Sequence, residues 1–365
     1  MQTPIAATKA FYSRNARWIP VLFFILGFLA DALLLQRIDD LFTILQQAAY
    51  LIFAGWLIGL ELLESCGKYH PGDGRWARLW RYREAAIHFA LGALLNAYTM
   101  FFFMSASVLT SFIFIGVLVA VLILNEFMRF GRSQTFVHMA LWSLCVLSFS
   151  LCVVPTLVGF IGFGPFLMAV ACSLAAGVLF CLRLRRSAGE NKGKVDRHAF
   201  LPVALVHVIF IALYYARVIP PVPLSVSFIG IYHGLTKAEG KYFLTYSDTS
   251  WKILGNGDVD FRARPDDKIY CFARIFSPTN FKDQLVVRWL LKDPKRGWES
   301  QDAIPLPVTG GREKGFRGYT VKNHYSEGTW RCQVETSDGR EIGRLTFKVT
   351  LDPTVTERSL ALQVE

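Results

Sequence analysis

Five ionisable side chains lie near the ends of long apolar segments, where they could form a proton, ion or metal site. They are Glu61, Glu64, His88, Glu126 and His138. Carboxylates and imidazoles are common metal ligands and proton relays, and ionisable groups inside a membrane span are functional candidates by default. No motif such as His-Glu-x-x-His connects the five. That absence favours the alternative, in which they reach the membrane surface and pair with arginines such as Arg78 and Arg129.

The elements that would position these side chains are seven apolar segments. A membrane-spanning helix needs about 20 mostly apolar residues. We therefore expect spans at residues 18–35, 41–63, 85–104, 107–128, 135–155, 157–182 and 200–218. Gly55 and Gly59 make a small-residue face in the second span, which favours close helix packing. The chain is 53% hydrophobic and 18% charged, which is too apolar for one soluble domain of ordinary composition.

The basic residues of this half lie on alternate connections between the expected spans. Sixteen of the eighteen Lys and Arg residues before position 220 precede the first span or follow the second, fourth or sixth, and only Arg37 and Arg217 break the pattern. Short cytoplasmic loops retain Lys and Arg. We therefore expect the N-terminus inside the cell and everything after residue 219 outside the membrane. Most of the net charge of +11 then reflects topology, and we expect no nucleic-acid partner.

After Pro220, Pro221 and Pro223 the sequence changes to short alternating runs separated by turn residues, which is typical of β-structure. We expect strands at residues 224–231, 268–276, 284–292, 303–308, 316–322, 329–336 and 344–350. Asp338-Gly339 predicts a hairpin between the last two strands, because both residue types tolerate positive φ. The proline-rich residues 220–223 would be a stiff linker, and residues 353–365 a C-terminal tail.

Two cysteines and a tryptophan in this region are arranged as in an immunoglobulin-type sandwich. Alternation places Cys271, Trp289 and Cys332 on core faces of three strands, and such sandwiches enclose a Trp between two facing cysteines. Trp330 stands where a Tyr usually forms the tyrosine corner, so we expect an Ig-like sandwich and not a true Ig domain. On the oxidising side of a membrane Cys271 and Cys332 can form a disulfide. The alternative is two buried free thiols.

Several stretches of this region resemble a known bacterial family. They include Asp267 to Ile275, Val286-Val287-Arg288-Trp289, Pro305 to Val308, Gly328 to Cys332, Asp338-Gly339-Arg340 and Leu345-Thr346-Phe347. The region they span, about residues 265–350, is similar to the domain-of-unknown-function 2914 family of C-terminal β domains. The resemblance implies a location in the bacterial envelope. It implies no known reaction, ligand or catalytic residue.

Together these patterns predict a seven-helix membrane bundle (1–219), a linker (220–223) and an exported Ig-like β-sandwich (224–352). We expect a multi-pass protein of the bacterial inner membrane, with its N-terminus cytoplasmic and its C-terminal domain periplasmic. The predicted function is non-enzymatic: the bundle contacts lipids and anchors a module that binds a periplasmic protein or an envelope polymer. The alternative is an intramembrane enzyme or transporter that uses the Glu and His cluster. We expect no cofactor or metal, and the sequence predicts no oligomeric state.

Overall fold

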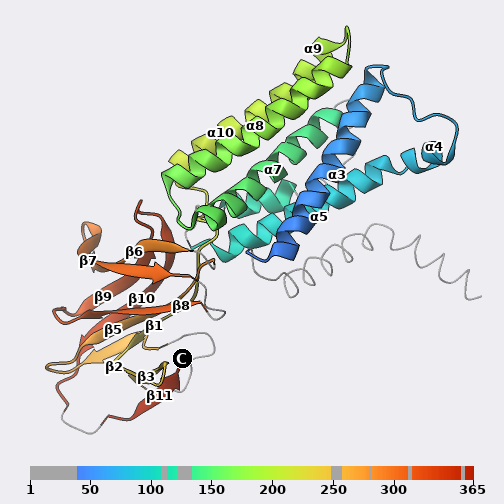
Figure 1. Cartoon of the computed structure of the whole chain (residues 1–365). Helices are drawn as coiled ribbons and strands as arrows, with labels where there is room; N and C mark the ends of the chain where they lie inside the picture. The colour runs from blue at the N-terminus through green and yellow to red at the C-terminus, as the bar shows by residue number, and fades with distance from the viewer. Residues whose placement is uncertain are drawn as a thin grey trace, which may run out of the picture.

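The computed structural model describes residues 39–107, 113–121, 134–247, 257–278, 281–310, 315–354 and 358–365. A bundle of long helices meets a stack of β-sheets at one end (Figure 1). The helices are α3 (Leu41–Ser65), α4 (Arg75–Trp80), α5 (Arg83–Met104), α7 (Gln134–Val158), α8 (Phe163–Ser187), α9 (Lys192–Val195), η2 (Asp196–Phe200) and α10 (Leu201–Tyr215).

Five described helices are long and apolar enough to cross a membrane, where the sequence predicted seven spans. They are α3, α5, α7, α8 and the continuous Lys192–Tyr215 helix. The expected span at 18–35 and most of the one at 107–128 lie outside the described residues. Residues 113–121 are helical, and Phe114 packs edge-on against both Phe102 and Phe210. The last helix begins at Lys192 and not near residue 200, because its first two turns are charged and lack an apolar signal.

Close helix packing at Gly55 and Gly59 is confirmed. A Cβ atom added at Gly55 would lie 2.9 Å from Nε1 of Trp142, and one added at Gly59 would lie 3.1 Å from the ring of Phe180. The Trp142 indole also donates to the Leu51 carbonyl at 2.9 Å. The absence of side chains at the two glycines therefore lets α7 and α8 approach α3.

The β half contains eleven described strands in three sheets. The strands are β1 (Ser225–Tyr232), β2 (Gly234–Ala238), β3 (Lys241–Ser247), β4 (Asp260–Ala263), β5 (Ile269–Phe276), β6 (Lys282–Asp293), β7 (Gly297–Thr309), β8 (Phe316–Lys322), β9 (Gly328–Glu335), β10 (Glu341–Leu351) and β11 (Leu360–Val364). The sheet orders are β1-β5-β8, β4-β10-β9-β6-β7 and β11-β3-β2. All seven expected strands are present, and Asp338-Gly339 does connect β9 and β10 as a hairpin.

The three sheets form layers, with β1-β5-β8 in the middle. On one face of β5, Ile269, Cys271 and Ala273 join the buried core shared with the five-stranded sheet. On its other face, Phe272 packs with Phe228, Tyr242 and other side chains of the β11-β3-β2 layer. The alternation therefore predicted the sandwich core correctly, and a third layer covers its back.

Two segments differ from their expected form. Residues 360–364, within the expected tail, are strand β11, which pairs antiparallel with β3 from Leu360↔Ser247 to Val364↔Phe243. The proline-rich residues 220–223 are buried and lie against both halves, so they do not form an exposed spacer. In both places, contacts from distant parts of the chain decide the structure.

Candidate functional site

The structure joins three of the five ionisable side chains at the basic end of the helices. His138 Nδ1 on α7 lies 2.9 Å from Glu61 Oε2 on α3, and the His138 and Glu61 side chains are 1% and 12% exposed. The His88 ring on α5 meets the His138 ring edge-on, with 5.4 Å between centroids. Among the described residues, no polar atom lies within hydrogen-bond distance of the buried His138 Nε2.

Glu64 is separate from this group, although it lies only three residues from Glu61. Its Oε2 accepts from the Trp80 indole at 3.0 Å and lies 3.3 Å from the Arg83 guanidinium, with about a third of the side chain exposed. Pairing with an arginine near the membrane surface is what the alternative to a functional cluster predicted for these side chains. The partner here is Arg83, which was not among the arginines named for that role. Glu126 lies outside the described residues. No three His, Cys, Asp or Glu side chains in the described ranges are arranged to hold a metal ion.

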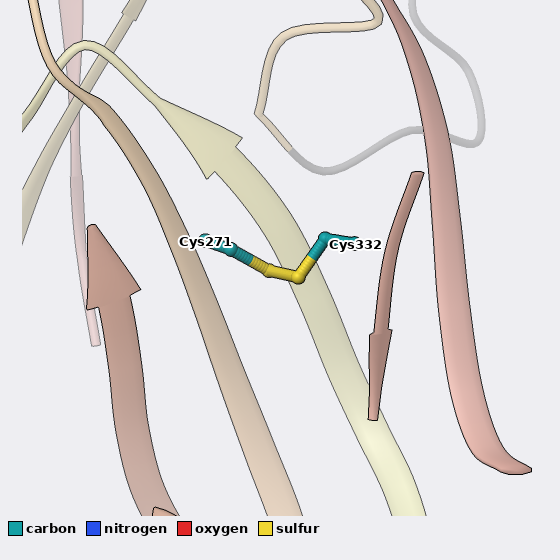
Figure 2. Close-up of a disulfide and its surroundings, with 2 residues drawn as sticks. All are labelled: Cys271 and Cys332. Atoms are coloured by element: carbon teal, nitrogen blue, oxygen red, sulfur yellow. A yellow bond between two sulfur atoms is a disulfide. The ribbon is translucent and has the colours of Figure 1, made fainter. Parts of the chain in front are cut away.

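In the β half, Cys271 on β5 and Cys332 on β9 form a disulfide. Their sulfur atoms are 2.07 Å apart and the bond connects the middle sheet to the five-stranded sheet (Figure 2). Trp289 on β6 lies opposite Cys332 in register and is fully buried. The Cys-Trp-Cys arrangement of an Ig-like sandwich is therefore present.

Trp330 replaces the tyrosine corner with a related contact. Its indole Nε1 donates to the Ser326 carbonyl, four residues upstream, at 2.9 Å. A tyrosine corner also ties a ring to the backbone a few residues upstream, through its hydroxyl group. In the same loop the Glu327 carboxylate accepts from the Leu351 N–H at 2.8 Å. The loop from Ser326 therefore has a structural role.

A buried polar network around His233 was not predicted. The His233 side chain is 3% exposed and stacks on Phe261, with 3.9 Å between ring centroids. Its Nε2 lies 3.1 Å from Ser247 Oγ and 3.5 Å from Asp258 Oδ2. Its Nδ1 faces Arg358 Nη1 at 3.3 Å. Burial, followed by the charge of Arg358, lowers the pKa of His233 to about 4.

The contacts of His233 do not match those of a Ser-His-Asp catalytic triad, because Arg358 at 3.3 Å lies closer to Nδ1 than the Asp267 carboxylate at 3.8 Å. A guanidinium only donates hydrogen bonds, so we assign the lone pair of the neutral ring to Nδ1, which faces Arg358. Nε2 then carries the proton and donates toward Ser247 and Asp258. A triad histidine must instead accept the serine proton on that nitrogen. The network therefore fastens strand ends together: Arg358, just before β11, also pairs with Asp267 at 2.6 Å.

The two halves are joined through Arg340, next to the β9–β10 hairpin. Its guanidinium donates to the carbonyls of Tyr214 and Ile219, at 3.2 and 3.3 Å, and stacks 3.5 Å from the Tyr214 ring centroid. Asp338 pairs with it at 3.0 Å. Further hydrogen bonds run from Lys282 N–H to the Gly159 carbonyl and from Ser107 to the Glu341 carbonyl. The junction thus involves α5, the α7–α8 turn and α10.

The end of the sandwich away from the helices carries an open groove of about 690 Å³. It lies between the β4–β5 turn, the β8–β9 loop and the end of β10. Arg264 and Asp352 form an ion pair there at 3.2 Å, and hydrogen bonds from Thr354 lower the pKa of Asp352 to about 2. Asp266, Asp267 and Lys268 also line the groove, so acidic and basic side chains are both present.

Comparison with known proteins gives one informative match. Residues 282–349 match a family described as "Protein of unknown function (DUF2914)", the family that the sequence resembles. The match covers strands β6 to β10, including Trp289 and Cys332. None of the curated proteins compared with the chain matches it.

Similarity to solved structures is weak. A β-glucosidase from Listeria innocua, in complex with gluconolactone, is 9% identical with a TM-score of 0.18, covering 30% of this chain and 16% of the enzyme. The Pseudomonas fluorescens alkylpurine DNA glycosylase AlkC, bound to DNA, is 9% identical with a TM-score of 0.23, covering 86% of this chain and 100% of that protein. Neither likeness carries a structural or functional argument.

Proposed function

We propose that this chain is an integral protein of the bacterial inner membrane whose helices anchor a periplasmic Ig-like binding module. One observation carries the proposal: the basic connections and the β-sheets lie at opposite ends of the helices (Figure 1). The described basic residues of the alternating pattern are Lys68, Arg75, Arg78, Arg81, Arg83, Arg183, Arg185, Arg186, Lys192, Lys194 and Arg197. Because Lys and Arg are retained on the cytoplasmic side, the module would face the periplasm.

Connectivity supports a sixth span in addition to the five described helices. Helix α5 ends beside the β-sheets, where Ser107 contacts Glu341, whereas α7 begins at the opposite end, where His138 meets Glu61. The described residues between these two ends, 113–121, are helical, which is consistent with the predicted span at 107–128. Helix α3 begins at the sheet end, so a first span over residues 18–35 would start on the basic side. The seven-span topology accommodates all of these positions.

Reporter insertions test the sidedness. Alkaline phosphatase fused after Glu365 should be active, because it folds in the oxidising periplasm, and green fluorescent protein at the same position should be dark. Insertion of the same reporters at Gly189, in the turn after α8, should give the opposite result. Fluorescence of the C-terminal fusion would refute the proposal.

A second candidate function, proton or ion handling inside the membrane, is favoured by one observation. His138 is buried and has only one of its two nitrogens paired among the described residues. Glu61→Gln, which keeps the size and acceptor oxygen of the side chain, should then abolish an associated phenotype without lowering expression. Glu64→Gln is the matched control, and equal phenotypes in both variants would refute this function.

A further inference from the structure

The outward face of the five-stranded sheet is strongly basic. On β4, β6, β9 and β10, polar residues alternate with buried core residues and point away from the sandwich. This outward face carries seven cations, Arg262, Lys282, Arg288, Lys292, Arg331, Arg344 and Lys348, and three carboxylates, Asp260, Glu335 and Glu341. Seven cations against three carboxylates leave this face with an excess of four positive charges, which an anionic ligand would offset.

Most of these cations have no carboxylate partner. Arg288 is paired with both oxygens of Glu335, at 3.0 and 3.1 Å, and Arg344 lies 3.5 Å from Glu341. Within the described ranges, no carboxylate lies within ion-pair distance of Lys292, Arg331 or Lys348. Burial and then the charge of Arg344 lower the pKa of Arg331. An incoming anion would relieve this repulsion.

Three of the cations form a diagonal stripe that ends at an aromatic ring. Arg331 on β9 lies opposite Thr346 on β10 and Leu290 on β6. Arg344 lies two residues before Thr346 on β10, and Lys292 lies two residues after Leu290 on β6. The three cations therefore lie along one diagonal across the strands, with about 7 Å between neighbouring positions. Trp298 on β7 lies opposite Lys292, and the Arg331 guanidinium covers its ring at 3.8 Å.

We propose that this stripe, Arg344, Arg331, Lys292 and Trp298, binds an acidic polysaccharide of the cell envelope. The inference rests on the proposed periplasmic location of the module. Arginine pairs with carboxylates in a planar, two-pronged geometry, and contact with the Trp298 ring restrains the Arg331 guanidinium. Regularly spaced cations beside an aromatic ring suit a chain of sugar rings that carry carboxylates.

Other occupants fit this face less well. Strands β6 and β10 both start at the helices, at Lys282 and just after Arg340, and run away from them. A bilayer could therefore not lie flat on the stripe. An acidic peptide is usually added to a sheet at its edge, through free backbone groups. The three cations of the stripe lie on β6, β9 and β10, which have neighbours on both sides, and of the stripe residues only Trp298 is on an edge strand, β7. The groove near Asp352 is lined by both acidic and basic side chains, so it does not favour one sign of ligand charge.

Binding of polygalacturonate to the full-length protein in detergent tests the inference. We expect saturable binding at 50 mM salt that weakens at least tenfold at 500 mM, and no binding of neutral dextran of equal length. Arg331→Ala should weaken binding about tenfold by removing one bidentate pair. Lys348→Gln removes one charge from the same face off the diagonal, and should change the affinity less than threefold.

Three results would overturn the inference: no binding of polygalacturonate at 50 mM salt, equally tight binding of polyglutamate, or equal losses in the Arg331 and Lys348 variants. Arg331→Lys keeps the charge and should recover part of the affinity, which distinguishes a binding effect from misfolding. Because this assay uses purified protein, its failure would leave the reporter test of sidedness unaffected, and the two proposals can fail separately.

Discussion

The two halves of the molecule bury their histidines in different ways. In the β half, His233 has a partner at each ring nitrogen, with Ser247 and Asp258 on one side and Arg358 on the other. In the helical half, His138 is equally buried but pairs only through Nδ1, with Glu61. A fully satisfied buried network specifies structure, whereas an incompletely satisfied one needs another explanation. His233 therefore has a structural role, and His138 is the better functional candidate.

The largest expected effect comes from the disulfide between Cys271 and Cys332. Among the described residues, the β half contains a disulfide and the helical half does not. Replacing both cysteines, as Cys271→Ser with Cys332→Ser, opens a loop of 61 residues and should cost about 4 kcal/mol in the chain-entropy model. Thermal unfolding of the full-length protein, followed by Trp fluorescence, measures this. The control is Cys172→Ser, at an exposed free thiol in α8, which should leave the transition unchanged.

The next largest effect is a pH dependence of the free energy of unfolding of the β half. The folded-state pKa of His233 is about 4, below the value near 6.5 for an unfolded chain. As pH falls from 6.5 to 4, the unfolded chain binds a proton that the folded chain does not. The module should therefore lose about 3 kcal/mol across this window. His233→Asn should flatten the dependence, and an unchanged slope would contradict the pKa assignment.

A smaller effect should appear at the junction between the halves. Arg340→Gln removes charged hydrogen bonds to Tyr214 and Ile219, which should cost about 2 kcal/mol. The buried residues 219–223 should then open roughly 30 times more often, and limited proteolysis there should accelerate in proportion. Arg344→Gln, four residues away on the outward face, should leave the cleavage rate unchanged. Equal rates in both variants would show that Arg340 does not hold the junction.

The smallest effects should separate the two glutamates of α3. Glu61→Ala leaves the buried ring of His138 without its carboxylate and should cost between about 1 and 2 kcal/mol. Glu64→Ala breaks a partly exposed ion pair with Arg83 and should cost less than about 1 kcal/mol. Unfolding in detergent measures both. A larger loss for Glu64 would reverse the assignment of Glu61 as the buried partner.

Periodicity predicted the sandwich core because alternation directly reports which face of a strand is buried. It missed β2 and β3, whose turn at Glu239-Gly240 has positive φ at both residues, because such turns usually begin with Asn, Asp or Gly. It also missed β11, although Leu360, Leu362 and Val364 alternate with smaller or polar residues. The position of β11 at the chain end favoured a tail.

The sites were less predictable than the strands. The sequence placed Glu61, Glu64, His88 and His138 near the ends of apolar segments, but hydropathy does not fix how each helix is rotated about its axis. That rotation turns Glu61 toward His138 and leaves Glu64 with Arg83. The His233 network joins Asp258, Asp267 and Arg358, which lie 25 to 125 residues away along the chain. No local sequence pattern indicates that residues so far apart in the chain come into contact.

The contacts of Arg340 have a mechanical consequence. Because its guanidinium holds the carbonyls at the end of α10, a ligand that pulls on the sandwich would load that helix directly before it could stretch residues 219–223. The hydrogen bonds to Tyr214 and Ile219 would be sheared together, and parallel bonds resist force better than bonds broken one at a time. The module would then behave as a rigid extension of α10, able to bear load from an envelope polymer.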